Sequence, residues 1–185
     1  MSDLMKMLSN AIDADTISKI SEHIGADSGT TKSAIGAALP ALLGALGKNA
    51  QTKEGAEALH GAVAKDHDGG ILDNVAGMLG DGDGAKILQH VLGKAQPKVN
   101  LGVAQLAGLD ASSSQKLMET LAPVVLGAVG KKQREEGMSA DDLAKALTKE
   151  KDATPGLSGL ESMLDGDGDG DLDLSDLIKH GSKFF

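Results

Sequence analysis

Six aspartates towards the end of the sequence have the spacing of a calcium-binding loop. Residues 165–176 read D-G-D-G-D-G-D-L-D-L-S-D, and the acids are Asp165, Asp167, Asp169, Asp171, Asp173 and Asp176. Counted from the first aspartate they occupy positions 1, 3, 5, 7, 9 and 12 of a twelve-residue loop. An EF-hand supplies oxygen ligands to Ca²⁺ from these positions and needs glycine at position 6, where Gly170 stands. The sequence therefore predicts a Ca²⁺ site, with Mg²⁺ as the competing ion.

A solvated acidic linker is the alternative interpretation of this run, and the register argues against it. Shifting the frame by two residues places Leu172 at the glycine position, so only one frame fits. Helix starts flank the loop, at Thr154-Pro155 and at Ser175. Residues 154–185 are therefore expected to form a single EF-hand-like helix-loop-helix. Because Asp176 closes the loop instead of glutamate, the loop resembles that of dockerin modules, which implies binding in the micromolar to millimolar range.

The charge and composition limit the remaining possibilities. The chain has 18 basic and 27 acidic residues, a net charge of −9, which argues against nucleic acid or an anionic membrane as a partner. It has no Trp, Tyr or Cys, and its two aromatic residues are Phe184 and Phe185. The core must therefore consist of Ala, Leu, Val, Ile and Met, which suits closely packed helices. Disulfides, thiolate zinc sites and a cysteine nucleophile are excluded.

A repeat at an offset of 83 residues organises the body of the chain. Residues 25–48 align with residues 108–131, with eight identities in 24 pairs, including Pro40/Pro123 and Gly44/Gly127. Each copy predicts a long helix with a central proline and with glycines that let another helix approach. The expected helix starts are Thr30 and Thr31 in the first copy. In the second copy, Ser112 and Gln115 are expected to form a capping box.

We expect an all-α fold, a compact multi-helix bundle of two similar halves at about residues 12–94 and 95–185. Residues 1–150 form the duplicated helical domain, and the EF-hand-like segment lies within the second half. Apolar residues at helical spacing follow Asp15, Thr52 and Ser139, the last with Asp142 three residues on. The longest nearly apolar run, residues 34–47, is too short to span a membrane. Without a signal peptide the cytoplasm is the expected location, with leaderless export or the cell surface as alternatives.

Two stretches of the repeat resemble a known bacterial family. They are residues 24–79, which begin IGADSGTTKSAIGAALPALLGALGK, and residues 107–147, which begin AGLDASSSQKLMETLAPVVLGAVGK. Both resemble the family called domain of unknown function 937, related to the YidB-like group, over roughly residues 1–150. The resemblance implies an all-helical fold and no activity. Some YidB-like structures resemble homeodomain-type arrangements, which suggests DNA binding, but the acidic charge of this chain argues against it.

No catalytic motif accompanies these features, and none of the five histidines stands in a zinc-protease pair. The sequence therefore favours a calcium-binding, non-enzymatic scaffold or adaptor, whose C-terminal helix is ordered by Ca²⁺ and presents Phe184 and Phe185 to a protein partner. The alternative is a self-assembling fibre or coat protein, and a nucleic-acid-binding YidB-like protein comes third. Asp66 and Asp68 are interpreted as turn and cap residues rather than as a second ion site.

Overall fold

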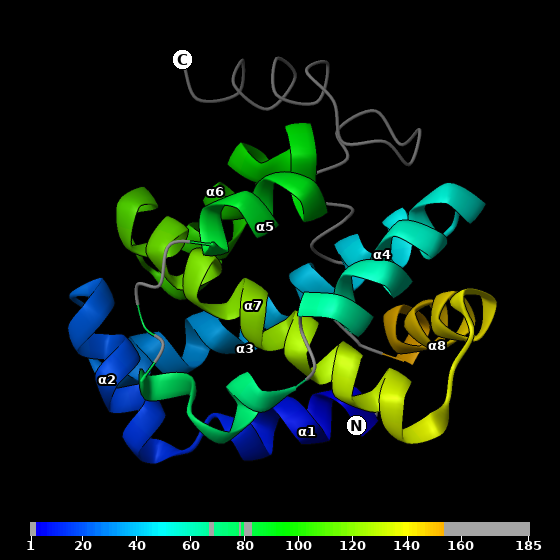
Figure 1. Ribbon diagram of the computed structural model, residues 1–185. Helices are drawn as coiled ribbons and strands as arrows, with labels where there is room; N and C mark the ends of the chain where they lie inside the picture. The colour runs from blue at the N-terminus through cyan, green and yellow to red at the C-terminus, as the bar shows by residue number, and fades with distance from the viewer. Residues whose placement is uncertain (1–2, 67–68, 78, 80–82, 154–185) are drawn as a thin grey trace.

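A computed structural model describes residues 3–66, 69–77, 79 and 83–153 of the 185-residue chain. Over these residues it contains helices and no strand, and the helices pack into one bundle (Figure 1). The helices are α1 (Asp3–Ala11), α2 (Ala14–Ile24), α3 (Ser28–Asn49), α4 (Lys53–Asp66), η1 (Gly70–Asp73), η2 (Val75–Gly77), α5 (Gly84–Leu92), η3 (Gly93–Ala95), α6 (Gln96–Ala107), α7 (Ala111–Glu136) and α8 (Ala140–Ala153). The predicted all-α bundle is confirmed.

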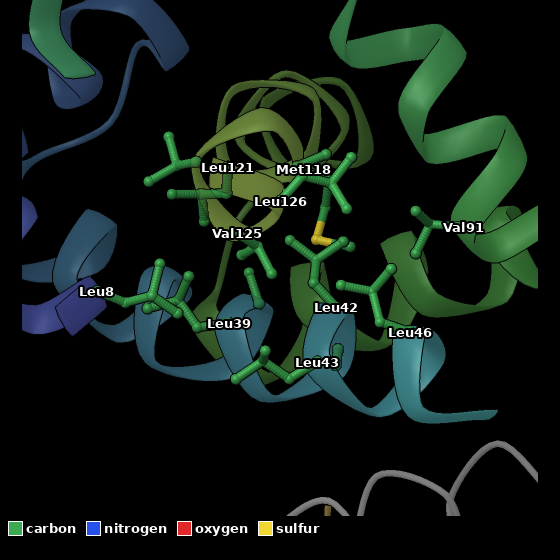
Figure 2. Packing of buried hydrophobic residues seen from close by; sticks show 14 of the residues in the cluster. Leu8, Leu39, Leu42, Leu43, Leu46, Val91, Met118, Leu121, Val125 and Leu126 are labelled. Atoms are coloured by element: carbon green, nitrogen blue, oxygen red, sulfur yellow. The ribbon is translucent and has the colours of Figure 1, made fainter. Parts of the chain in front are cut away.

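The core lies between the two long helices, α3 and α7, which contact each other along the middle of the bundle. Leu39 and Leu42 of α3 and Leu121 and Val125 of α7 are almost completely buried there (Figure 2). Met118 fills the same layer with an exposure of 0%. In the described residues the core is thus built from aliphatic side chains and methionine, as the composition predicts.

The two long helices begin with the same set of hydrogen bonds. Asp27 caps α3, because its Oδ1 accepts from the backbone N–H groups of Gly29 and Thr30 at 2.9 and 3.0 Å. The Thr30 hydroxyl donates to the other carboxylate oxygen at 2.6 Å. At α7, Asp110 accepts in the same way from two backbone N–H groups at 2.9 and 3.0 Å and from a hydroxyl at 2.7 Å. The donors there are Ser112 and Ser113, and the two starts are therefore equivalent.

These caps correct the predicted helix starts. The prediction placed them at Thr30 and Thr31 and at a box of Ser112 with Gln115, whereas the N-cap residues are Asp27 and Asp110. A carboxylate can accept several hydrogen bonds at once, and the hydroxyl side chains lie one turn inside the helix, where they support the carboxylate. The Gln115 amide instead donates to Glu119 at 2.9 Å.

The helix that precedes each long helix also ends in the same way. Gly25 ends α2 with φ 75° and ψ 33°, and Gly108 ends α6 with φ 70° and ψ 29°. Positive φ is strained for residues with a side chain, so glycine suits both corners. The next residue closes each corner through its backbone N–H, from Ala26 to Ser21 at 3.0 Å and from Leu109 to Ala104 at 2.9 Å. The α2–α3 and α6–α7 corners are therefore two copies of one structure.

Each long helix contacts helices that belong to the other copy of the repeat. Helix α3 packs against α6 and α8, while α7 packs against α2 and α4. This set of contacts stays the same when α2 is exchanged with α6, α3 with α7 and α4 with α8. Each long helix thus packs on helices of the other copy. The boundaries at residues 12–94 and 95–185, and the division of the chain near residue 150, stay predictions.

The prediction that the repeated glycines let another helix approach can be checked at Gly47 and at Gly127, where different kinds of helix lie opposite. A Cβ atom on Gly47 would lie 3.3 Å from the carbonyl oxygen of Leu147, so α8 approaches α3 closely there. At Gly127 the nearest neighbour is the side chain of Ile71, which belongs to the short helix η1. The neighbour is therefore the α-helix α8 at Gly47 and the short helix η1 at Gly127.

Two other helix starts confirm the prediction. Thr52 accepts a hydrogen bond from the backbone N–H of Gly55 at 3.1 Å and so caps the first turn of α4. Before α8, the Ser139 hydroxyl donates to the Asp142 carboxylate at 2.6 Å and accepts from the Asp142 N–H at 3.2 Å. The Ser139 backbone N–H also donates to the Asp142 carboxylate at 3.3 Å, which completes a capping box with aspartate in place of glutamate.

Candidate functional site

The residues of the predicted calcium loop lie outside the described part of the chain. This holds for Asp165, Asp167, Asp169, Asp171, Asp173 and Asp176, and equally for Phe184 and Phe185. Of the acids considered for a second ion site, Asp66 is the last residue of α4 and Asp68 lies outside the described residues. Among the residues that are described, no three His, Cys, Asp or Glu side chains gather as a metal site would require.

The described residues do form a cleft between α4 and α5, with the end of α3 at its base. Its volume is about 1000 Å³. Apolar side chains from four helices line much of it, and they are Leu46, Ala58, Leu59, Ala62, Ile87, Val91 and Leu126. Charged and polar residues complete the lining, namely Asn49, Thr52, Lys65, Asp83, Lys86 and His90. The cleft therefore combines an apolar wall with polar groups, as ligand sites commonly do.

Several polar groups of the cleft are held by neighbouring backbone or side-chain atoms. The Asn49 amide donates to the carbonyl oxygen of Val91 at 2.8 Å and so joins the end of α3 to the end of α5. The His90 Nδ1 lies 2.8 Å from the carbonyl oxygen of Lys86, and because a carbonyl only accepts, Nδ1 is the donor. The Lys86 ammonium lies 3.2 Å from the Asp83 carboxylate on the exposed rim. In the neutral ring, Nε2 is then the nitrogen able to accept.

The cleft could not be found from the sequence pattern. Its residues come from α3, α4, α5 and α7, which are distant in the chain, and no spacing within one segment links them. The apolar pair Ile87 and Val91, four residues apart, does predict that α5 turns one face inwards. It does not indicate which helix lies opposite that face.

The carboxyl groups whose pKa is lowered lie at helix starts rather than in this cleft. Hydrogen bonds from the Thr30 hydroxyl and then from its backbone N–H hold the pKa of Asp27 below its ordinary value. The hydroxyl and N–H of Ser113 lower the pKa of Asp110 in the same way. Ser139 lowers the pKa of Asp142, and the Thr16 backbone N–H lowers that of Asp13. Each bond favours the charged carboxylate, so these shifts have a structural cause.

We expect the caps to make stability fall at acidic pH. A lowered folded-state pKa contributes stability above the unfolded value, 3.8 for aspartate, and this contribution is lost as pH falls through the folded pKa. In the variant D27N/D110N, asparagine still caps both helices but does not titrate. Its Tm should therefore fall less steeply than that of the wild type below about pH 4. Circular dichroism melts across this range test the difference, and parallel curves would contradict the role of the two caps.

None of the helices in the described part of the chain combines the length and apolar character that a membrane span requires.

Comparison with known proteins leads to a family. No curated protein and no solved structure matched the chain. The sequence model of one family, described as "Bacterial protein of unknown function (DUF937)", matches residues 6–132. This match covers the paired corners before α3 and α7 and most of both long helices. The chain therefore belongs to the DUF937 family of bacterial proteins.

Proposed function

We propose that the protein is a calcium-binding, non-enzymatic scaffold or adaptor whose C-terminal helix is ordered by Ca²⁺. The observation that carries this proposal is the D-G-D-G-D-G-D-L-D-L-S-D run at residues 165–176, with an acid at each ligand position and Gly170 at the turn. Six carboxylates this close repel one another, and a bound divalent cation removes that repulsion. Phe184 and Phe185, the only aromatic residues of the chain, follow on the helix that leaves the loop.

The packed body supports a scaffold role. Each long helix is held by helices of the other copy, so the described helices form one packed body. The four carboxyl groups with shifted pKa values serve as helix caps, which accounts for their shifts without a catalytic role. Both observations favour a binding role over a catalytic role.

Isothermal titration of Ca²⁺ into the full chain tests the ion site. We expect the wild type to bind one ion in the micromolar to millimolar range. The variant Asp165→Ala, which removes the first ligand, should give no binding heat over the same range. Asp15→Ala is the matched control, because Asp15 is an exposed acid in the first turn of α2, and it should bind as the wild type does. Equal heats from wild type and Asp165→Ala would reject the site.

Self-assembly is a second candidate function, and α6 favours it. Leu101 and Leu106 are the two large apolar side chains exposed on the described surface, at 46% and 53%. At the equivalent positions of α2 the chain has Ser18 and His23, which are polar and exposed. Because the repeat does not require apolar side chains at these two sites, a contact of α6 with a second chain would account for them.

Size-exclusion chromatography with light scattering tests this candidate. If α6 mediates assembly, the wild type should elute above the mass of one chain, and the variant L101S/L106S should return to it. The matched control S18A changes the equivalent surface of α2 and should leave the mass unchanged. A wild-type protein of single-chain mass, with and without Ca²⁺, would eliminate assembly.

A further inference from the structure

The cleft between α4 and α5 is fixed by contacts at both ends of α5. Near the end of this helix, the Asn49 amide of α3 donates to the Val91 carbonyl oxygen at 2.8 Å. At its start, Gly84 lies so close to α7 that a Cβ atom there would collide with the backbone carbonyl oxygen of Glu119. Helices α4 and α5 both pack on α7 but make few contacts with each other. The cleft is therefore part of the packed structure, as preformed ligand sites are.

The apolar lining of the cleft has a buried part and an accessible part. Leu46 and Leu59 are buried, whereas Ala58 and Ala62 of α4 are exposed and Ile87 of α5 is partly exposed. The hydrophobic effect favours covering such side chains with another apolar group. The volume of about 1000 Å³ lies at the upper end of the range for sites that bind small organic molecules. The cleft is therefore large enough for a ligand with an apolar body of that size.

The lysines of the lining lie at the helix ends that are remote from the Asn49 contact. Lys65 is in the last turn of α4, and Lys86 is in the first turn of α5. The Lys86 ammonium lies 3.2 Å from the Asp83 carboxylate, whereas Lys65 has no ion pair among the described residues. Lysines thus outnumber acids two to one in the lining, although the whole chain has 18 basic and 27 acidic residues. This part of the cleft is therefore complementary to one negative charge.

We propose that the cleft binds a small amphiphile with an apolar chain and a single carboxylate, of the long-chain carboxylate class. The chain lies between α4 and α5 against Ala58, Ala62 and Ile87, and the carboxylate lies beside Lys65 and Lys86. An acidic helix from a partner protein is the competing occupant. Such a helix would carry its anchors and charges along its whole length, whereas the lysines of the cleft stand only at the ends of α4 and α5 remote from Asn49.

Isothermal titration of carboxylates into the full chain tests the ligand class. Octanoate, decanoate and dodecanoate are used below their micelle concentrations and with EDTA, so that the proposed Ca²⁺ site takes no part. We expect one molecule to bind per chain, with an affinity that rises about fourfold for each added CH₂ group, since each buries further apolar surface. No binding of any of the three, or an affinity independent of chain length, would reject the proposal. Titration of Ca²⁺ tests the ion site separately, so either proposal can fail alone.

A variant that fills the cleft tests where the ligand binds. Ala62→Trp places a large side chain in the cleft from an exposed position and should weaken decanoate binding about tenfold or more. Gly61→Trp is the matched control, because Gly61 is the neighbouring residue, is exposed and does not line the cleft. It should leave the affinity unchanged. Equal losses from the two variants would place the ligand elsewhere on the protein.

A second variant tests the role of the charge with surface substitutions that leave the packed core untouched. K65Q/K86Q should weaken the binding of decanoate about three- to tenfold and leave that of decan-1-ol, which has the same chain and no charge, unchanged. The control K53Q removes an exposed lysine of α4 that does not line the cleft, and it should affect neither ligand. Equal losses for decanoate and decan-1-ol in K65Q/K86Q would reject the carboxylate contact.

Light scattering without any added carboxylate tests for a protein occupant. The wild type and Ala62→Trp should have the same mass in solution if the cleft holds a small molecule. A wild-type dimer that Ala62→Trp converts to single chains would assign the cleft to a second copy of the chain and overturn the inference.

Discussion

Replacing Gly84 by alanine is expected to destabilise the protein by about 1–3 kcal/mol, the usual cost of forcing extra volume into a packed contact. The new methyl group would collide with the backbone carbonyl of Glu119, which cannot rotate away as a side chain can. Helix α5 would have to move off α7 and lose its contacts along that helix. Urea denaturation followed by circular dichroism measures the change in the free energy of unfolding.

The matched control for this substitution is Gly61→Ala in α4. Gly61 lies inside a helix, and its Cβ position meets nothing within 4 Å. The substitution should therefore stabilise the protein by about 0.4–1 kcal/mol, because alanine restricts the unfolded chain more than glycine does. Opposite signs at the two positions would establish the close approach of α5, whereas stabilisation by both substitutions would contradict it.

Truncating Leu121 to alanine should be the most damaging single change in the core. Its side chain has an exposure of 0% and belongs to the buried cluster that also contains Leu39 and Val125 (Figure 2). Removing three buried carbon atoms from such a site costs about 2–5 kcal/mol, since the neighbours fill the cavity only in part. Thermal and urea unfolding provide the measurement.

Leu106→Ala is the control for that truncation. Leu106 is a leucine on α6 with an exposure of 53%, so it loses the same atoms from a solvated position. We expect its free energy of unfolding to stay within about 0.5 kcal/mol of the wild type. A loss at Leu121 no larger than the loss at Leu106 would mean that the α3–α7 layer is not the core of the molecule.

Local features of the fold could be predicted from the sequence because they depend on neighbouring residues. Apolar spacing after Thr52 and Ser139 predicts α4 and α8, and both residues cap their helices as expected. The helix starts near Thr30 and Ser112 were wrong by two or three residues. The reason is that hydroxyl and carboxylate caps have similar sequence signatures, and the choice between them depends on which side chain reaches the free N–H groups.

The arrangement of the helices could be predicted in outline and not in detail. Residues 25–48 are repeated at residues 108–131, and this repeat predicts two similar long helices. It does not predict that α3 packs on α8 and that α7 packs on α4. Such pairings depend on the shape of whole helix faces, which periodicity does not describe. The cleft between α4 and α5 went unpredicted for the same reason, and the calcium loop stays a prediction from spacing alone.

The crossed packing has a consequence for the order in which the protein folds during synthesis. Helix α3 emerges from the ribosome early, yet two of its main partners, α6 and α8, are made later, and α8 extends to Ala153. The apolar faces of α3 therefore stay uncovered by those two helices until most of the chain has been translated. Duplication of a helical unit would suggest two modules that mature one after the other. Here the first copy is instead an intermediate that the second copy completes.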